Sequence, residues 1–279
     1  MQSIIKTLKN KNQYIKTNSG IWVRNFLLKN VPYLDINHLV SSNEYKQILN
    51  NEVNNKCIRS PNIDVEEFDH PNLIIISDGY GFETTCKALD DIPDVTIVGT
   101  NGALRKWPLK NRPLDYYVAN NPFVDIMKDL PKKTPSAKGI FSTRTYHEFV
   151  EEYDNIKYFY TPVSSKDYSG LNTNYGIKID DYRNPLAAAV RLAHVFKSEK
   201  ICLLCCDDIL KEKRIEAEKV GDFWVFPQQI TAHEVVDANL FWLNKNTRLE
   251  VSVIYNSCAI PFTNAKFCEL DKIKEFFGA

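Results

Sequence analysis

Hydrophobic and polar positions alternate along the chain in blocks, and the clearest boundary lies between residues 73 and 83. The apolar run Leu73–Ile76 contains three consecutive isoleucines, a composition typical of a strand buried on both faces of a sheet. The run ends at Asp78-Gly79-Tyr80-Gly81, and a helix-like stretch, FETTCKALDD, follows. We therefore predict the first strand–turn–helix unit of a nucleotide-binding α/β sheet, with its ligand site at the carboxyl edge.

The turn after this strand has features that suit a phosphate group. Gly79 and Gly81 allow a sharp turn and a close approach of the backbone to a ligand, and the helix that follows would present N–H groups and its positive end. Thr84 stands where a dinucleotide fingerprint has its third glycine, and no Walker lysine follows, so the turn is not a P-loop. A tight turn without any ligand is the alternative interpretation.

After residue 65 the chain alternates between strand-like and helix-like stretches. The predicted strands cover residues 95–98, 115–118, 138–141, 156–160, 201–205 and 251–255, and the predicted helices cover residues 123–130, 185–197 and 232–246. Strands separated by helices favour an α/β fold with a doubly wound, mainly parallel, Rossmann-like sheet. Residues 161–183, rich in Ser, Asn, Gly and Tyr, predict a loop or lid. The charged run KEKRIEAEK at residues 211–219 predicts a solvated helix.

Residues 1–65 have a different pattern, with apolar residues at helical spacing and no strand-like run. We expect a helical N-terminal extension over 1–65, which packs on the main domain or on a second subunit. The Rossmann-like transferase domain then covers 66–279. Such an extension is compatible with a homodimer.

Composition narrows the class of protein. The chain has 279 residues, and its 35 Lys and Arg balance 35 Asp and Glu, so it lacks the basic footprint of a nucleic-acid-binding protein. No apolar run is long enough for a membrane span, and the first residues lack the apolar core of a signal peptide. Seven cysteines without framework spacing fit a reducing compartment. We expect a cytoplasmic protein.

Polar residues follow strand after strand. Because the carboxyl ends of parallel strands meet at one edge, these side chains are expected to gather there. Short amides suit ribose hydroxyls, base edges and sugar oxygens because they offer both a donor and an acceptor, although they also suit turns. The nucleotide-binding candidates at the strand ends are Asp78, Gly79, Gly81, Asn101, Gly102, Asn120, Asn121 and Asp207.

Two further kinds of chemistry involve a metal ion and a base. Asp78, Asp207 and Asp208 have the ligand type that Mg²⁺ prefers beside substrate phosphates, but no DxD motif joins them. His233 lies in QQITAHE, where a loop is expected to enter a helix. Its unperturbed pKa of about 6.5 suits proton abstraction from a hydroxyl group.

The order of the motifs resembles a known family. The motifs are IIISDGYGFE, VTIVGTNGALRKW, RPLDYYVANNP, NPLAAAVRLAHVFKSEKICLLCCDD and ANLFWLNKNTRLEVSVIYNS, within residues 70–260. This order is similar to that of the MptE-like domain family, which covers archaeal 6-hydroxymethyl-dihydropterin pyrophosphokinases and flagellin-modifying motility accessory factors. It also resembles the related bacterial CMP-sialic-acid sialyltransferases.

The resemblance implies roles for several residues. The first turn lacks the Pro and Ser of the family's Gly-x-Gly-Pro-Ser-Leu. Asn101 and Asn120-Asn121 stand where the pterin kinases carry aspartates, and Asn-Pro after the third strand is closer to the sialyltransferases, whose asparagines hold the cytidine nucleotide without a metal. Asn184-Pro185 replaces the small Ser/Thr-Gly pair of the family's base-binding helix start, which adds Asn184 to the candidates. His233 falls near the place of the family's catalytic base.

Three functional hypotheses result. The first is a sialyltransferase-like glycosyltransferase that moves a sugar from a CMP-type nucleotide-sugar to a small-molecule or glycan acceptor, with His233 as the base and no cofactor required. The second is a pyrophosphokinase that uses Mg-ATP, with Asp78, Asp207 or Asp208 holding the metal. The third is a non-catalytic nucleotide-binding protein.

Overall fold

The computed structural model describes residues 14–16, 21–23, 42–60, 68–79, 81–90, 92, 94–107, 112–131, 135–162, 177–179, 181, 184–206, 218–220, 223–225, 227–254 and 262–278. Its centre is a nine-stranded sheet in which each strand runs parallel to its neighbours. From one edge to the other the strands are β13 (Lys266–Cys268), β12 (Glu250–Ile254), β9 (Lys200–Leu204), β3 (Asn72–Ile76), β4 (Thr96–Thr100), β5 (Tyr116–Ala119), β6 (Lys138–Ser142), β7 (Lys157–Pro162) and β8 (Lys178–Ile179). The predicted α/β fold with a parallel sheet is confirmed.

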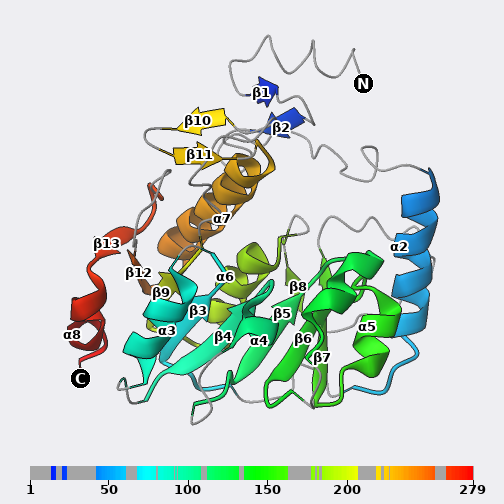
Figure 1. Cartoon of the computed structure of the whole chain (residues 1–279), viewed down its shortest axis with the longest axis horizontal. Coiled ribbons are helices and arrows are strands. Elements are labelled where there is room, and N and C mark those ends of the chain that lie inside the picture. The colour runs from blue at the N-terminus through cyan, green and yellow to red at the C-terminus, as the bar shows by residue number, and fades with distance from the viewer. Residues whose placement is uncertain are drawn as a thin grey trace.

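The chain reverses its direction of travel across the sheet at β3 (Figure 1). From β3 it proceeds outward through β4 to β8, and it then returns to place β9 on the other side of β3. Leu73 pairs with Thr96 of β4 and with Ile201 of β9. A switch of this kind separates the loops that leave neighbouring strand ends, and ligands bind in the resulting crevice in open α/β sheets.

Helices cover both faces of the sheet, as Figure 1 shows. One face carries α3 (Phe82–Leu89), α4 (Ala103–Lys106), the 3₁₀ helix η3 (Val124–Asp129), α5 (His147–Glu152), the 3₁₀ helix η4 (Leu270–Lys272) and α8 (Ile273–Phe277). The opposite face carries α6 (Pro185–Val195) and α7 (Pro227–Asn246). This double coverage explains why the strands are apolar on both faces.

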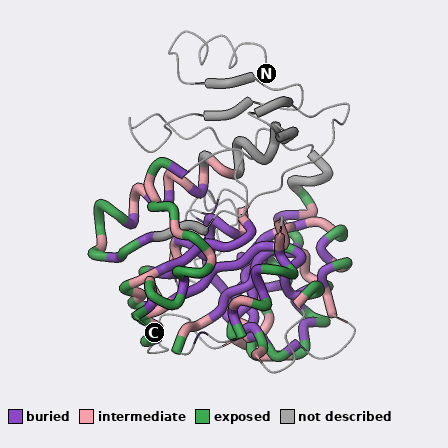
Figure 2. The backbone as a smooth tube through the Cα atoms, turned by 60° about the vertical axis from the view of Figure 1, so that its left-hand side comes forward, coloured by how far each residue is buried: buried purple, intermediate pink, exposed green. Residues whose placement is uncertain are grey.

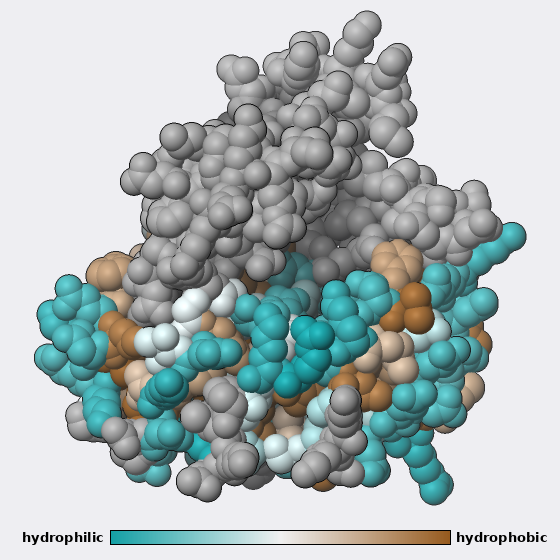
Figure 3. All heavy atoms as spheres, in the orientation of Figure 1, coloured by the Kyte–Doolittle hydropathy of each residue, from teal (hydrophilic) through white to brown (hydrophobic). Residues whose placement is uncertain are grey.

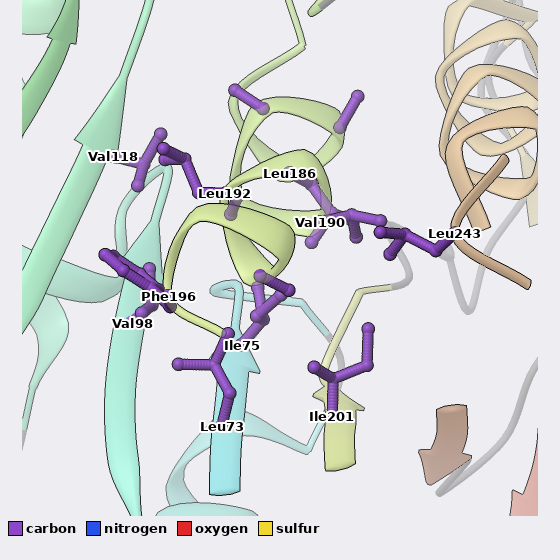
Figure 4. Close-up of a cluster of buried hydrophobic side chains, with 14 of the residues drawn as sticks. Leu73, Ile75, Val98, Val118, Leu186, Val190, Leu192, Phe196, Ile201 and Leu243 are labelled. Atoms are coloured by element: carbon purple, nitrogen blue, oxygen red, sulfur yellow. The ribbon is translucent and has the colours of Figure 1, made fainter. Parts of the chain in front are cut away.

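Alternate side chains of β3 pack into two separate hydrophobic cores, one on each face of the sheet. Leu73 and Ile75 pack with Leu186 and Val190 of α6, and Leu243 reaches the same cluster from α7 (Figure 4). The intervening residues, Ile74 and Ile76, pack on the other face with residues of α3. Buried residues accordingly run through the strands, while exposed ones lie on the outer sides of the helices (Figure 2). The run of isoleucines thus places β3 at the centre of the molecule.

Helix α2 (Ser42–Asn55) packs beside α5 at the edge of the domain (Figure 1). The Nδ2 of Asn51 donates to the carbonyl oxygen of Pro122 at 2.8 Å, and the Nδ2 of Asn55 donates to the carbonyl oxygen of Thr145 at 2.7 Å. Glu52 forms a buried ion pair with Arg144 at 3.2 Å. Helix α2 of the N-terminal extension is therefore bonded to loops at the carboxyl edge of the sheet.

The structure differs from the sequence-based prediction in several places. The region expected to be purely helical contains β1 (Tyr14–Lys16) and β2 (Ile21–Val23), which pair antiparallel. The charged run contains part of β10 (Glu218–Val220), which pairs antiparallel with β11 (Phe223–Val225). Strands of three residues are too short for a period-2 pattern, and their partners supply the hydrogen bonds. Helix α7 begins five residues before the predicted start, and the segment 123–130 forms a 3₁₀ helix. The expected loop or lid at residues 161–183 contains the end of β7 and the whole of β8, which pair parallel. Residues 163–176, 180, 182 and 183 of this segment lie outside the described residues.

The described surface is mainly polar. Within the part of the chain that the structure describes, no helix has both the length and the apolar composition needed to cross a membrane. On the face that carries α3, α4 and α5, hydrophilic residues alternate with small hydrophobic areas (Figure 3). The exposed large hydrophobic side chains come from separate parts of the fold, and they are Val53, Val124, Ile156 and Phe267.

A buried isoleucine, Ile75, and an exposed one, Ile156, allow a matched test of how much β3 contributes to stability. Ile75 is 0% exposed and Ile156 is 45% exposed. Ile75→Ala should lower the free energy of unfolding by about 2–5 kcal/mol, because it removes buried methyl groups and leaves a cavity. Ile156→Ala should change it by about 0.5 kcal/mol or less. Urea unfolding followed by circular dichroism measures both, and equal effects would contradict the assignment of β3 to the core.

Candidate functional site

A pocket of about 190 Å³ lies at the carboxyl end of β5. Its floor comes from the end of β5, and its walls come from the loop after β4, from η3 and from the first residue of α6. The lining residues are Asn101, Tyr117, Val118, Ala119, Asn120, Asn121, Pro122, Ile126, Asp129 and Pro185. Three of the predicted nucleotide-binding residues, Asn101, Asn120 and Asn121, therefore meet at one site.

The glycine turn after β3 is tied to the sheet. The N–H of Gly79 donates to the carbonyl oxygen of Cys205 at 2.9 Å, which continues the pairing of β3 with β9 beyond the strands. Gly81 has a φ of 77° and stands at the N-terminus of α3, a left-handed conformation that glycine adopts without steric cost. Gly81 thus supplies the sharp turn that the sequence predicted, while the N–H of Gly79 serves the sheet.

Asp78 contacts the loop after β4. Its Oδ2 accepts a hydrogen bond from the Nζ of Lys106 at 2.8 Å. A Cβ on Gly102 would lie 2.3 Å from the same oxygen, so the absence of a side chain at Gly102 lets the two loops meet. Asp78 and Gly102 are neighbours, as predicted, and in this structure the Asp78 carboxylate is engaged by a lysine.

Asn101 links three strand ends. It has a φ of 52°, a left-handed conformation that asparagine adopts more readily than most residues. Its Nδ2 donates to the Oγ of Ser77 at 2.8 Å, and its backbone carbonyl accepts from the hydroxyl of Tyr117 at 2.9 Å. These bonds fix the loop after β4 between β3 and β5.

Asn120 differs from the other predicted asparagines because one atom of its side-chain amide lacks a hydrogen-bond partner among the described residues. It is 3% exposed, and its Nδ2 donates to the Oδ2 of Asp181 at 2.9 Å. The hydroxyl of Tyr160 donates to the same carboxylate oxygen at 2.6 Å, and burial raises the pKa of that tyrosine well above its usual value. The Oδ1 of Asn120 has no hydrogen-bond partner among the described residues. Because a carboxylate only accepts, the Asp181 contact fixes which end of the amide is nitrogen.

Asn121 precedes the 3₁₀ helix η3, which forms one wall of the pocket. Its Oδ1 accepts from the N–H of Phe123 at 3.0 Å, and its Nδ2 donates to the Oδ1 of Asp125 at 3.0 Å. Its backbone carbonyl accepts from the N–H of Tyr146. Both ends of this amide are used within the fold, so Asn121 shapes the pocket wall.

Asn184 caps helix α6. Its Oδ1 accepts from the N–H of Leu186 at 2.9 Å and from the N–H of Ala187 at 3.3 Å, which is the usual arrangement of an N-cap asparagine. Pro185 follows at the first helical position and lines the pocket. The pocket wall thus depends on where this cap starts the helix.

Asp129 and Tyr117 line the pocket but were not among the predicted site residues. Asp129 is 7% exposed, and its Oδ1 has no hydrogen-bond partner among the described residues. Burial raises the pKa of this carboxyl. Burial also raises the pKa of Tyr117, and the nearby charge of Asp129 raises it further. No signal in the sequence pointed to Asp129, because in the predicted helix it lies on the polar side with Asp125 and Lys128.

His233 occupies a different environment from the pocket lining. It lies in the second turn of α7, not at the helix entry, and its ring stacks on Phe262 with centroids 3.8 Å apart. Asp207 and Asp208 lie outside the described residues. Among the residues that the structure does describe, no group of three or more His, Cys, Asp or Glu side chains is arranged to hold a metal ion. The roles given to His233 and the aspartates stay predictions.

The chain was compared with known protein families, curated proteins and solved structures, and a solved structure with a similar fold was found. No protein family model matches the chain, and no curated protein matches it. The fold is similar to that of the MAf glycosyltransferase from Magnetospirillum magneticum AMB-1, with a TM-score of 0.62 and 10% sequence identity. The match covers 82% of this chain and 39% of that protein's chain. At this identity the likeness shows a shared α/β fold, and membership of the MptE-like family stays a prediction.

The cap at Asn184 gives a stability test within the site. Asn184→Ala should lower the free energy of unfolding by about 1 kcal/mol, because the first N–H groups of α6 lose their acceptor. Asn184→Asp keeps an acceptor at the same position and should recover most of that loss. Thermal unfolding of the three proteins measures the effect, and an Asn184→Asp protein as unstable as Asn184→Ala would argue against the capping role.

Proposed function

We propose that the chain is a nucleotide-dependent transferase, and more specifically a glycosyltransferase that uses a nucleotide-sugar donor of the CMP type. The observation that carries the proposal is the pocket at the carboxyl end of β5, which Asn101, Asn120 and Asn121 line together. This is the edge at which open α/β sheets bind ligands. The similar fold of the MAf glycosyltransferase supports the class of reaction.

The Asn120 amide gives the proposal its most specific support. Its nitrogen is engaged by Asp181, and its oxygen is buried without a partner among the described residues. An unpaired buried acceptor costs about 1–3 kcal/mol, which a donor group on a ligand would offset. Ribose hydroxyls and the exocyclic amine of cytosine are donors of this kind.

The remaining roles are those that the sequence motifs suggest. The N-terminus of α3 at Gly81 would face the phosphate groups, since its dipole and N–H groups favour an anion. His233 would take the proton from the acceptor hydroxyl of a small molecule or glycan. The transfer itself would then need no cofactor.

Pyrophosphoryl transfer from Mg-ATP is the alternative that uses the same fold. It needs a metal ion, which Asp78, Asp207 or Asp208 would hold. The Oδ2 of Asp78 lies 2.8 Å from the Nζ of Lys106, so a metal ion at this oxygen would compete with the lysine. The nucleotide-sugar reaction leaves the ion pair in place, which favours it over a kinase that uses Asp78.

A ligand screen tests the proposal directly. CMP, UDP, GDP and ATP, each with and without Mg²⁺, should be added in thermal-shift experiments. We expect CMP to stabilise the protein without Mg²⁺, by about 2.7 kcal/mol at 100 times its Kd. Stabilisation by ATP that depends on Mg²⁺ would favour the pyrophosphokinase, and no response to any nucleotide would reject both enzymes.

The base is tested by a substitution that preserves the ring stack. His233→Phe keeps an aromatic ring against Phe262 but cannot accept a proton, so kcat for sugar transfer should fall by about 10²-fold or more while nucleotide affinity stays the same. His194→Ala, on the exposed side of α6, is the control. Steady-state kinetics and nucleotide titration measure the two effects. Unchanged turnover in His233→Phe would remove His233 from the mechanism.

A further inference from the structure

Asp129 is a buried carboxyl that none of the roles above uses, and it lines the same pocket as Asn120. The two residues are 7% and 3% exposed. The Oδ1 atoms of both lack a hydrogen-bond partner among the described residues. Since buried polar atoms are paired in the large majority of cases, two unpaired acceptors in one pocket lining point to a ligand that supplies donors.

The local geometry holds Asp129 in this place. Asn121 fixes the start of η3 through the N–H of Phe123. In a 3₁₀ helix, residues three apart lie on the same side, so Ile126 and Asp129 both face the pocket. The carboxyl is therefore part of a built wall, set in place by the turn that precedes it.

The charge of the lining limits what the pocket accepts. The lining side chains include one carboxyl group and no lysine or arginine. Arg105 and Lys128 act to lower the pKa of Asp129, but its burial acts more strongly and raises it. A phosphate would find no cation here and would be repelled by an ionised Asp129. Neutral groups that carry hydrogen-bond donors suit the pocket better.

The size of the pocket limits the ligand further. Its volume of about 190 Å³ is below the roughly 300–1,000 Å³ of sites that enclose drug-sized molecules. It therefore fits one ring of a nucleotide-sugar and not the whole molecule. Pro122, Ile126 and Pro185 provide apolar surface for the carbon side of such a ring.

We propose that this pocket holds a sugar ring through its vicinal hydroxyl groups, which donate hydrogen bonds to the Oδ1 atoms of Asn120 and Asp129. This inference rests on the proposed function, and it names the two protein atoms that would contact the sugar ring. The ring is either the ribose of the nucleotide or the sugar to be transferred, because both present the same hydroxyl chemistry. The phosphates then lie outside the pocket.

The test compares Asp129→Asn with Asp125→Asn. The control lies on the same 3₁₀ helix, and it removes the same charge from an exposed carboxyl while keeping an acceptor for Asn121. Calorimetric titrations use CMP, 2′-deoxy-CMP, 3′-deoxy-CMP and CMP-sialic acid. Asp129→Asn replaces a carboxyl acceptor by a weaker amide acceptor, so it should weaken the binding of the ligand whose ring occupies the pocket by about 10-fold. Asp125→Asn should leave the binding of all four ligands unchanged. The melting temperature of Asp129→Asn should stay the same or rise, because the buried Oδ1 of Asp129 has no hydrogen-bond partner to lose among the described residues.

Comparing the four ligands shows whether the ribose of the nucleotide or the transferred sugar occupies the pocket. If the ribose occupies the pocket, wild-type protein should prefer CMP to a deoxy analogue, and Asp129→Asn should lose that preference. If the transferred sugar occupies it, Asp129→Asn should weaken CMP-sialic acid and not CMP. Asp129→Asn protein that binds all four ligands like the wild type would overturn this inference and leave the proposed function standing. Wild-type protein that binds none of them would overturn both.

Discussion

Strand β3 hydrogen-bonds to β4 on one side and to β9 on the other, and both of its faces are buried. The pairing extends beyond the strand, since the N–H groups of Ser77 and Gly79 donate to the carbonyls of Leu204 and Cys205. The glycine turn is therefore an extension of the sheet and not a free loop. The described loops that follow β3 and β4 are positioned relative to this central strand, because its parallel neighbours share its register.

The amides at this edge divide into two groups by what their atoms contact. The side chains of Asn101, Asn121 and Asn184 bond to protein groups, where Asn101 holds a loop and the other two hold the turns that lead into helices. Asn120 also makes a contact within the fold, but it leaves an acceptor atom unpaired among the described residues. The first group shapes the pocket, and Asn120 together with Asp129 gives it a chemical preference. Amides of one type at one edge thus have different physical roles.

The sequence predicted the parallel sheet because buried strands carry a strong local signal, as the isoleucines of β3 show. It also predicted that the amides gather, because strand ends in a parallel sheet must meet. It did not predict that Asn184 caps a helix and Asn121 starts one, since candidates were chosen by residue type and a polar strand end suits turns as well as ligands. Asp129 was missed because only tertiary packing shows that a carboxyl inside a short helical pattern is buried. The paired strands β1 and β2 were missed because strands of three residues have no measurable period.

Helix α2 carries one more consequence for the domain. Its Asn51 and Asn55 bond to carbonyls of the segment 143–145, and that segment precedes Tyr146, whose N–H bonds to Asn121. A shortened recombinant fragment that starts at β3 would deprive these buried carbonyls of their donors and leave Arg144 without its carboxylate. A fragment for expression should therefore include α2 from Ser42 onward, although the nine-stranded sheet begins thirty residues later.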